Sequence, residues 1–385
     1  MNEKIEEALT RGVERIYPSK DALVERLATG KPLRVYHGID PTGPSLHIGH
    51  VVQLLKLREL QDMGHHVILL IGDFTATIGD PTGKKSSRKP QTRDEVLNNC
   101  KNYGKQAEAV LDMSKVELRF NSEWLSEMNF ADVLALASNF TVQQMIERDM
   151  FQQRIKDGEP INLQEFLYPA MQGYDTVALG ADMEIGGNDQ TFNMLAGRTL
   201  MAKQGREKFV ITLKLITDAS GVKMGKTEGN MVSLDDTPAN VYGKIMSQPD
   251  TLMPAFFESA TRISAKEIDD ILALSPRDAK MRLAYEVTKT IFGEAEGREA
   301  EGRFVATIQN KETPRDIPVV VAISGSLLSE VLLGEKIIKS KGEFARLVKD
   351  GGVTVEGEKI NDLFYRVDKK LTVRVGKLRF LRIEV

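Results

Sequence analysis

The stretch at residues 33–71, LRVYHGIDPTGPSLHIGHVVQLLKLRELQDMGHHVILLI, decides the fold class. Its first residues, 33–36, predict a short strand, and a turn rich in glycine and proline follows. Apolar residues then recur at helical spacing over about 46–63, with Ser45 as the candidate N-cap. Residues 67–71 form a continuous apolar run, which is typical of a strand buried on both faces of a parallel sheet. Strand, helix and strand in this order predict a βαβ unit.

The chain around this unit extends the same alternation. Residues 84–160 have a mostly helical and more polar pattern, which predicts an insert. The alternation resumes with a helix from Pro169, since proline suits a first helical position, and with strands near 183–185 and within 209–216. The sequence therefore predicts an α/β fold with a doubly wound, Rossmann-like parallel sheet in residues 1–234, interrupted by a helical insert at about 84–160.

Two further units are predicted after this sheet. Residues 235–312 are rich in helical pattern and predict an α-helical domain. Residues 318–385 mix short helices with β-like segments and predict a small α+β domain. This last unit carries 13 Lys and Arg against 9 Asp and Glu, a net charge of +4, so the rest of the chain carries −7 of the total of −3. That contrast indicates a module that meets an anion.

The overall composition is that of a globular protein without a membrane span. Hydrophobic residues make up 41% of the 385 residues and charged residues 28%, and no apolar run is long enough to cross a bilayer. Residues 1–30 predict an amphipathic helix rather than a signal peptide. Cys100 is the single cysteine, and one thiol forms neither an intrachain disulfide nor a cysteine zinc cluster. We therefore expect a cytoplasmic protein without zinc.

The sequence LHIGH at residues 46–50 is the first candidate for chemistry. His47 and His50 share one face of the first turn of the predicted helix, and Gly49 leaves room for a ligand to approach the backbone. A helix N-terminus attracts phosphate, to which the imidazoles can donate hydrogen bonds. Alone, such a pair is more often a cap or a surface feature than a site.

The segment KMGKT at residues 223–227 is the second candidate. Two lysines and a hydroxyl can close over a triphosphate and neutralise the charge that develops on pyrophosphate, although a lysine-rich loop is usually just solvated. Together, the two segments resemble the HIGH and KMSKS signatures of class I aminoacyl-tRNA synthetases, in the same order along the chain. Gly225 and Thr227 stand in place of the serines of the second signature.

Four further segments narrow the resemblance to the tyrosyl-tRNA synthetase family, and the resemblance covers nearly the whole chain. They are YHGIDPT at 36–42, IGDPTGK at 78–84, YPAMQGYD at 168–175 and IGGNDQ at 185–190. In the last segment, Asn188 departs from the usual serine.

The resemblance implies a site for tyrosine made of Tyr36, Asp80, Tyr168, Gln172, Asp175 and Gln190. Three of these residues lie on one face of a helix, because positions 168, 172 and 175 are separated by four and three. The resemblance places Asp175 and Tyr36 at the phenolic hydroxyl and the others around the ammonium and carboxylate groups. A buried carboxylate that accepts the O–H of tyrosine is left unpaired when phenylalanine binds, which favours tyrosine. On a bare reading, Asp175 could equally form a surface ion pair.

The resemblance also implies that ATP is a substrate bound with Mg²⁺, which reacts with tyrosine to give tyrosyl-adenylate. The residues that it implies for ATP binding are Gly38, Asp40, Gly49, Gly187, Asp189 and Lys226. The residues that it implies for catalysis at the phosphates are Thr42, His47, His50, Lys84, Arg88, Lys223, Lys226 and Thr227.

For the second step, the resemblance implies that tRNA(Tyr) is the acceptor and that a homodimer binds it across subunits. Residues 235–312 would approach the anticodon, and residues 318–385 resemble the S-four-like RNA-binding domain. The candidate phosphate contacts there are Lys336, Lys339, Arg346 and Lys349.

Three alternatives stay open on the sequence alone. A tryptophanyl-tRNA synthetase shares both signatures, but the pairing of Tyr36 with Asp175 and the basic module favour tyrosine. A catalytically idle RNA-binding paralogue would not need the charged residues at 223–227. A small-molecule adenylyltransferase would have no use for the basic module.

Overall fold

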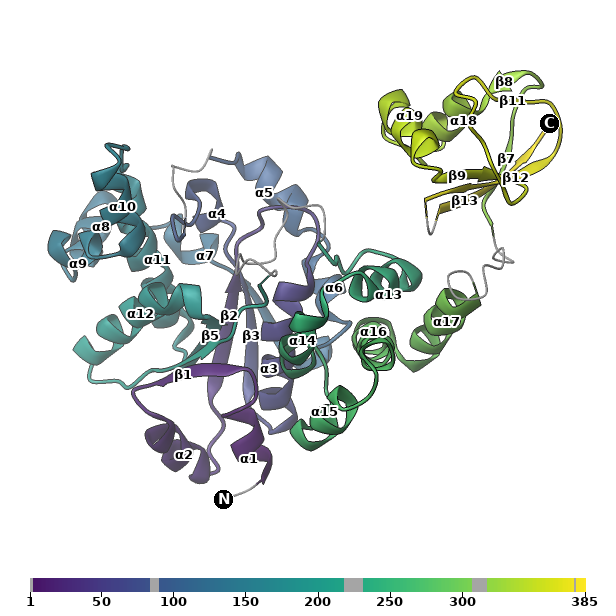
Figure 1. The fold of residues 1–385 in the computed structure, drawn as a ribbon. Coiled ribbons are helices and arrows are strands. Elements are labelled where there is room, and N and C mark those ends of the chain that lie inside the picture. The colour runs from purple at the N-terminus through teal and green to yellow at the C-terminus, as the bar shows by residue number, and fades with distance from the viewer. Residues whose placement is uncertain (1–2, 84–89, 218–230, 307–316, 377–378) are drawn as a thin grey trace.

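The computed structural model describes residues 3–83, 90–217, 231–306, 317–376 and 379–385. A six-stranded sheet at its centre has the strand order β1-β6-β5-β2-β3-β4 (Figure 1). Its strands are β1 (Val13–Tyr17), β2 (Arg34–Ile39), β3 (His66–Ile71), β4 (Val116–Phe120), β5 (Met183–Gly187) and β6 (Phe209–Leu213). β1 is antiparallel to β6, and the other neighbours pair in parallel. The predicted α/β fold with a doubly wound parallel sheet is confirmed.

The order of the strands reverses between β2 and β5. From β2 the chain moves outward to β3 and β4, whereas from β5 it moves to β6 on the opposite side. In doubly wound sheets, ligands bind at the carboxyl ends of the strands beside such a reversal. In this chain those ends are followed by Asp40 and Asn188.

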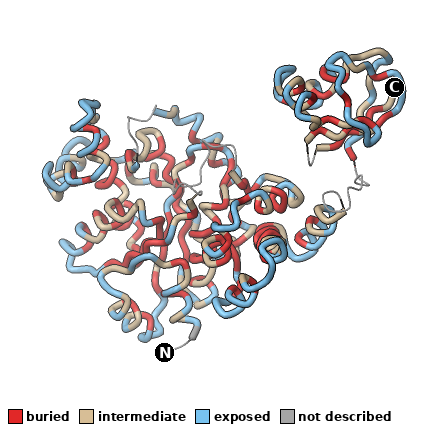
Figure 2. The backbone as a smooth tube through the Cα atoms, viewed as in Figure 1, coloured by how far each residue is buried: buried red, intermediate tan, exposed pale blue. Residues whose placement is uncertain are grey.

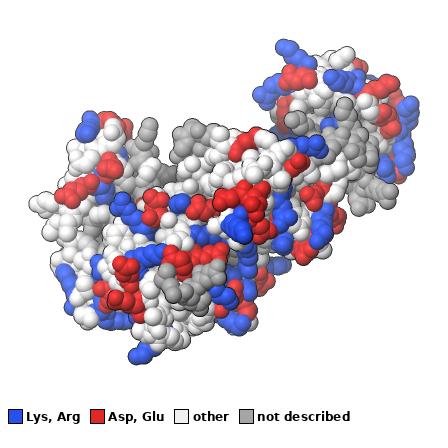
Figure 3. All heavy atoms as spheres, turned by 60° about the horizontal axis from the view of Figure 1, so that its bottom comes forward, with Lys and Arg blue, Asp and Glu red and all other residues white. Residues whose placement is uncertain are grey.

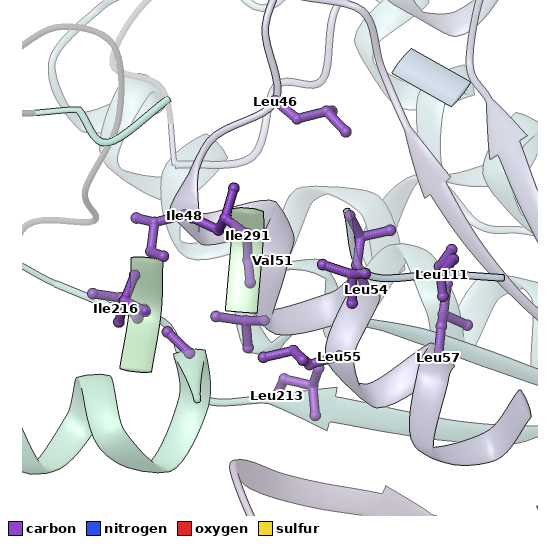
Figure 4. Close-up of a cluster of buried hydrophobic side chains, with 14 of the residues drawn as sticks. Leu46, Ile48, Val51, Leu54, Leu55, Leu57, Leu111, Leu213, Ile216 and Ile291 are labelled. Atoms are coloured by element: carbon purple, nitrogen blue, oxygen red, sulfur yellow. The ribbon is translucent and has the colours of Figure 1, made fainter. Parts of the chain in front are cut away.

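Helix α3 (Ile48–Asp62) connects β2 to β3 and completes the predicted βαβ unit. Its apolar side chains lie in the largest core cluster, where Figure 4 shows Val51 and Leu55 among side chains from β6 and from helix α16 (Pro276–Phe292). Each such buried side chain contributes about 1.5–3 kcal/mol. The N-cap is His47 and not Ser45 as predicted, because the Ser45 hydroxyl donates to Asp235 instead.

The prediction of one helix over residues 1–30 is wrong. Helices α1 (Glu3–Ala8) and α2 (Lys20–Ala28) flank the strand β1. β1 lies at the edge of the sheet and pairs with β6, from Val13 opposite Leu213 to Tyr17 opposite Val210. Its sequence, VERIY, contains charged residues that resemble those of the neighbouring helices, so pairing with β6 and not local propensity determines its conformation.

The region predicted as a helical insert contains a strand of the main sheet, which corrects that prediction. β4 pairs with β3 in parallel over five residues. Helices α4 (Thr75–Ile78), α5 (Arg93–Cys100) and α6 (Tyr103–Ala107) lie between β3 and β4. The helices after β4 are α7 (Ser122–Leu125), α8 (Phe130–Ala137), α9 (Val142–Ile146) and α10 (Asp149–Lys156). β4 is a partly exposed edge strand, VELRF, and its charged residues interrupt the apolar pattern by which a buried strand is recognised in a sequence.

Helix α11 (Leu163–Leu179) packs closely against α12 (Thr191–Lys203). A Cβ atom on Gly173 would lie 2.9 Å from the backbone nitrogen of Gly197, so this approach depends on glycine. Pro169 lies inside α11 and not at its first position, because the helix already begins after Asn162, whose side chain takes part in a capping box. The predicted start of this helix was therefore wrong.

After the sheet the chain is helical and then forms a second, smaller α+β unit. The first part contains α13 (Pro238–Met246), α14 (Met253–Ala260), α15 (Ala265–Leu272), α16 and α17 (Glu294–Phe304). The second has a five-stranded sheet in the order β10-β9-β12-β13-β7 and a two-stranded sheet of β11 and β8. Its elements are β7 (Val319–Val321), β8 (Ser326–Leu327), α18 (Leu328–Gly334), α19 (Lys341–Lys349), β9 (Val353–Val355), β10 (Glu358–Lys359), β11 (Arg366–Val367), β12 (Leu371–Val375) and β13 (Arg379–Glu384).

This second unit has a core of its own, which includes Leu332, Phe344 and Val373. Figure 2 shows buried segments in red within this unit. The helices α13 to α17, in contrast, contribute their buried side chains to the cluster that also covers the main sheet. Across the described ranges, none of the helices is long and apolar enough to cross a membrane.

Candidate active site

The carboxyl end of β2 is tied to helix α11. Tyr168 of α11 donates its hydroxyl hydrogen to Asp40, with Oη and Oδ2 2.7 Å apart, and Thr75 donates to the other oxygen of Asp40 at 2.7 Å. A Cβ atom on Gly72 would lie 2.0 Å from that oxygen, so only glycine leaves room for the carboxylate. Burial, together with the nearby Asp40 and Asp80, raises the pKa of Tyr168 well above its usual value, so it stays a donor.

A second contact joins the segments 78–84 and 185–190. Gln190 donates through Nε2 to Oδ2 of Asp80 at 2.7 Å. Thr82 donates its hydroxyl to the other oxygen at 2.6 Å and accepts in turn from Arg148 at 2.7 Å. Asp80 and Gln190, which are far apart in the sequence, thus lie together beside the carboxyl end of β5.

Asp175 is a buried carboxylate, 3% exposed. It accepts from the indole nitrogen of Trp124 at 2.8 Å and from the amide nitrogen of Asn121 at 3.3 Å. Burial raises the pKa of Asp175 well above its usual value, and these two donors act in the opposite direction by stabilising the charged form. Asp175 is therefore not a surface ion pair, and Trp124 is a hydrogen-bond donor to it.

Tyr36 and Gln172 form hydrogen bonds with the buried side chains of Thr176 and Glu184. Tyr36 is fully buried, and its Oη lies 2.7 Å from Oγ1 of Thr176. Gln172 donates to Glu184 at 3.0 Å. Glu184 also forms an ion pair with the fully buried Lys208. The lone acidic residue in the apolar strand MEIGG was the one sequence signal that pointed to this pair.

The two histidines of LHIGH cap helix α3. Nδ1 of His47 accepts from the backbone nitrogen of Gly49 at 3.1 Å, and Nδ1 of His50 accepts from the backbone nitrogen of His47 at 3.1 Å. In a neutral imidazole whose Nδ1 accepts, the hydrogen is on Nε2, so each ring presents a donor. A Cβ atom on Gly49 would lie 2.9 Å from the His47 ring, which keeps this residue a glycine.

The chain that follows KMGKT returns to these histidines. Ser233 forms a β-bridge with His47, and Ile48 donates its backbone N–H to Val232 at 2.9 Å. The predicted phosphate-binding residues Lys84, Arg88, Lys223, Lys226 and Thr227 themselves lie outside the described residues.

The remaining predicted ATP-binding residues surround the ends of β2 and β5. Thr42 is exposed and donates its backbone N–H to the Asp40 carbonyl at 2.8 Å. Gly38 lies near the end of β2. A Cβ atom on Gly187 would lie 2.5 Å from Oδ1 of Asp189, so the turn after β5 also needs glycine at that position.

Comparison with known proteins supplies the family. A model of the class I tRNA synthetases for tryptophan and tyrosine (W and Y) matches residues 28–309. The tyrosine–tRNA ligase of Carboxydothermus hydrogenoformans is 45% identical, over 98% of this chain and 97% of the relative. That of Thermotoga maritima is 44% identical, over 95% and 94%. The chain belongs to the tyrosyl-tRNA synthetase family.

A solved structure agrees with this assignment. A C-terminally truncated mitochondrial tyrosyl-tRNA synthetase of Coccidioides posadasii has a TM-score of 0.66 and 26% identity, over 78% of this chain and 92% of that chain. The predicted family and function are confirmed: this chain is an aminoacyl-tRNA ligase, which activates tyrosine and charges tRNA with it.

The basic residues predicted to contact tRNA lie in the second α+β unit of this synthetase. Lys336 and Lys339 follow α18, while Arg346 and Lys349 are on α19, and all four are exposed. On the face that Figure 3 presents, basic and acidic side chains are interspersed. Within the described part of the chain, no group of three or more His, Cys, Asp or Glu residues is arranged to hold a metal ion.

Proposed function

We propose that this synthetase makes tyrosyl-adenylate at the carboxyl ends of β2 and β5 and transfers the tyrosyl group to tRNA(Tyr). The proposal rests on two hydrogen bonds, each of which joins two of the four segments 36–42, 78–84, 168–175 and 185–190. Tyr168 meets Asp40, and Gln190 meets Asp80, each at 2.7 Å. These contacts lie where the strand order reverses, the usual ligand position of such a sheet.

The amino acid would lie between helix α11 and the strands. Asp80, Tyr168 and Gln172 would surround its ammonium group, and Gln190 would lie beside its carboxylate. Its phenol would reach Asp175, which Trp124 and Asn121 hold in place. Phenylalanine would leave this buried carboxylate without a partner, so the site would select tyrosine.

In the first step, a carboxylate oxygen of tyrosine would attack the α-phosphorus of ATP. One P–O bond forms, the bond to the bridging oxygen breaks, and pyrophosphate leaves with the electron pair. The nucleophile is already ionised, so no general base is needed, and the protein acts by positioning and by electrostatic stabilisation. His47 and His50, together with Thr42, would donate to the phosphates, while Asp189, beside Gly38, Gly49 and Gly187, would bind the nucleoside.

The residues outside the described ranges would complete the phosphate site. Lys84, Arg88, Lys223, Lys226 and Thr227 would neutralise the departing pyrophosphate. The bridge between His47 and Ser233 supports this role for Lys223, Lys226 and Thr227, because Ser233 follows them in the sequence and lies beside the histidines. Mg²⁺ would enter as its complex with ATP, held mainly by phosphate oxygens.

In the second step, a hydroxyl oxygen of the terminal adenosine of tRNA would attack the carbonyl carbon of the adenylate. The bond between the carbonyl carbon and the phosphate oxygen breaks, AMP leaves with the electron pair, and the hydroxyl proton is lost to solvent as the ester forms. We propose that residues 235–312 approach the anticodon and that residues 318–385 bind RNA through Lys336, Lys339, Arg346 and Lys349. We further propose a homodimer that binds tRNA across its subunits, a catalytic domain over 1–234, and a location in the cytoplasm, where translation uses the product.

Charging of a tRNA(Tyr) transcript with labelled tyrosine tests this function. We expect ATP-dependent ester formation with tRNA(Tyr) and none with tRNA(Trp). The matched control is Asp80→Asn, which removes the proposed partner of the ammonium group while keeping the shape of the side chain. Charging of tRNA(Trp) with tryptophan, or no charging at all by the folded wild-type protein, would overturn the proposal.

A further inference from the structure

We propose that Lys208, through Thr176, sets the direction of a hydrogen-bond chain that makes Tyr36 a donor to the phenol of the substrate. Lys208 would be a positioning residue, because it touches neither substrate. This inference rests on the proposed function and adds to it a determinant of the choice between tyrosine and phenylalanine.

Lys208 lies just before β6 and is completely buried. Its Nζ donates to Glu184, to Oγ1 of Thr176 at 2.7 Å and to the Met194 carbonyl at 2.9 Å. These three acceptors use all three hydrogens of an ammonium group. A Cβ atom on Gly197 of α12 would lie 2.5 Å from Nζ, so any larger residue at that position would clash with the ammonium group.

An ammonium group can only donate, so Thr176 is an acceptor for Lys208. Oγ1 of Thr176 accepts from Lys208 and lies 2.7 Å from Oη of Tyr36. Either hydroxyl could donate across that second distance. With one lone pair already engaged by Lys208, the arrangement that uses every group has Thr176 donating its hydrogen to Tyr36.

Tyr36 then has its own hydrogen to donate. Glu184 is the competing acceptor, and because its two oxygens already accept from Lys208 and Gln172, the substrate phenol can compete with it for this hydrogen. Burial, with Glu184 and Asp175 nearby, raises the pKa of Tyr36 well above its usual value, so the hydrogen stays on the tyrosine. Tyr36 can therefore donate to a phenol oxygen in the tyrosine site.

Asp175 closes the chain at its other end. Trp124 and Asn121 donate to Asp175 and, against the effect of burial, favour its charged form, which can only accept. The phenol of tyrosine would accept from Tyr36 and donate to Asp175, so the hydrogen bonds run in one direction from Lys208 to Asp175. Phenylalanine can make neither contact, so it would leave the Tyr36 hydrogen and the Asp175 carboxylate without a substrate partner.

The test is Thr176→Val, which removes the hydroxyl link and leaves the Lys208–Glu184 pair in place. The readout is the ratio of kcat/KM for tyrosine to that for phenylalanine in ATP–pyrophosphate exchange. We expect this ratio to fall about tenfold, the equivalent of one hydrogen bond, through a higher KM for tyrosine with the phenylalanine values unchanged. Thr176→Ser, which keeps a hydroxyl, should restore the ratio.

Thr288→Val is the matched control, because Thr288 is equally buried but donates to the Ala284 carbonyl in helix α16. It should leave the ratio unchanged. An unchanged ratio in Thr176→Val, or an equal loss for both amino acids, would overturn the proposal while leaving the proposed function standing. A wild-type enzyme without tyrosine-dependent exchange would overturn the proposed function itself.

The role of Lys208 is tested by the double variant Lys208→Met with Glu184→Gln. Changing both partners avoids leaving one buried charge unpaired. We expect the same fall in the ratio as in Thr176→Val, and no further fall when all three changes are combined, because they interrupt one chain. Additive losses in the combined variant would contradict a single chain through Thr176.

Discussion

Tyr168 and Asp40 are joined by a 2.7 Å hydrogen bond that connects helix α11 to the carboxyl end of β2. The same helix carries Gln172 and Asp175 one and two turns farther on. The bond therefore positions the face of α11 that carries Gln172 and Asp175 relative to the carboxyl end of β2. Thr75 occupies the second oxygen of Asp40, so both sides of the carboxylate are held before any substrate binds.

Tyr168→Phe removes this bond without changing the shape of the side chain. We expect kcat/KM for tyrosine in pyrophosphate exchange to fall about 10- to 100-fold, since an acceptor is left unpaired in a partly buried site. Tyr174→Phe, on the same helix and half-buried, is the control and should change it little. Equal kinetics for the two variants would show that the Tyr168 bond is not part of the site.

Asp175→Asn tests selection at the phenol. The amide keeps the shape but lacks the charge and offers hydrogens where the carboxylate only accepts. We expect the preference for tyrosine over phenylalanine to fall by about 100-fold or more, mostly through tyrosine. The measurement is the ratio of the two kcat/KM values in exchange. Unchanged selectivity would remove Asp175 from the hydroxyl site.

Glu117 of β4 should make the stability of the protein depend on acid pH. Burial acts to raise the pKa of Glu117, but hydrogen bonds from His66, Arg119 and Arg34 outweigh it and lower the pKa to about 2. A lowered carboxylate pKa stabilises the fold above its unfolded value of 4.5, and this stabilisation is lost as the pH falls from there toward 2.

We therefore expect the wild type to lose about 1–2 kcal/mol more than Glu117→Gln when the pH falls from 6 to 3, a value reduced for the partial exposure of the group. Urea unfolding followed at several pH values measures this difference. Glu127→Gln, which changes an exposed glutamate on the loop after α7, is the control. Parallel pH profiles for the wild type and Glu117→Gln would contradict the assignment of these bonds.

Removal of the second α+β unit should separate the two reactions. This unit has its own buried cluster, so a chain that ends after Pro314 should still fold and form tyrosyl-adenylate. We expect its rate of tRNA charging to fall at least about tenfold, because phosphate contacts supply much of the affinity for RNA. The double change of Arg346 and Lys349 to Gln in the full chain should give a smaller loss that grows with salt. Equal survival of both reactions after truncation would exclude the unit from tRNA binding.

The centre of the sheet could be predicted from the sequence, and its edges could not. The run VILLI of β3 is apolar on both faces because helices cover both sides of that strand. β1 and β4 lie at the two edges, where partial exposure allows Glu and Arg, and their sequences carry no clear strand pattern. Their pairing with β6 and β3 depends on contacts distant in the sequence.

The same distinction holds within the site. Asp40, Asp80, Tyr168 and Gln190 could be proposed because each stands in a recognisable segment. Trp124 and Lys208 stand in none, and their contacts with Asp175 and Glu184 exist only once α11, β5 and β6 are packed together. A single buried lysine or tryptophan has no local pattern that separates it from an ordinary core or surface residue.

The most direct test of the account is ATP–pyrophosphate exchange by the purified wild-type protein with tyrosine, phenylalanine and tryptophan offered separately. We predict exchange with tyrosine, and rates with the other two amino acids that lie orders of magnitude lower. Exchange that is equal for tyrosine and phenylalanine, or that requires tryptophan, would contradict the assignment of Asp175 and Tyr36 to the phenol of tyrosine.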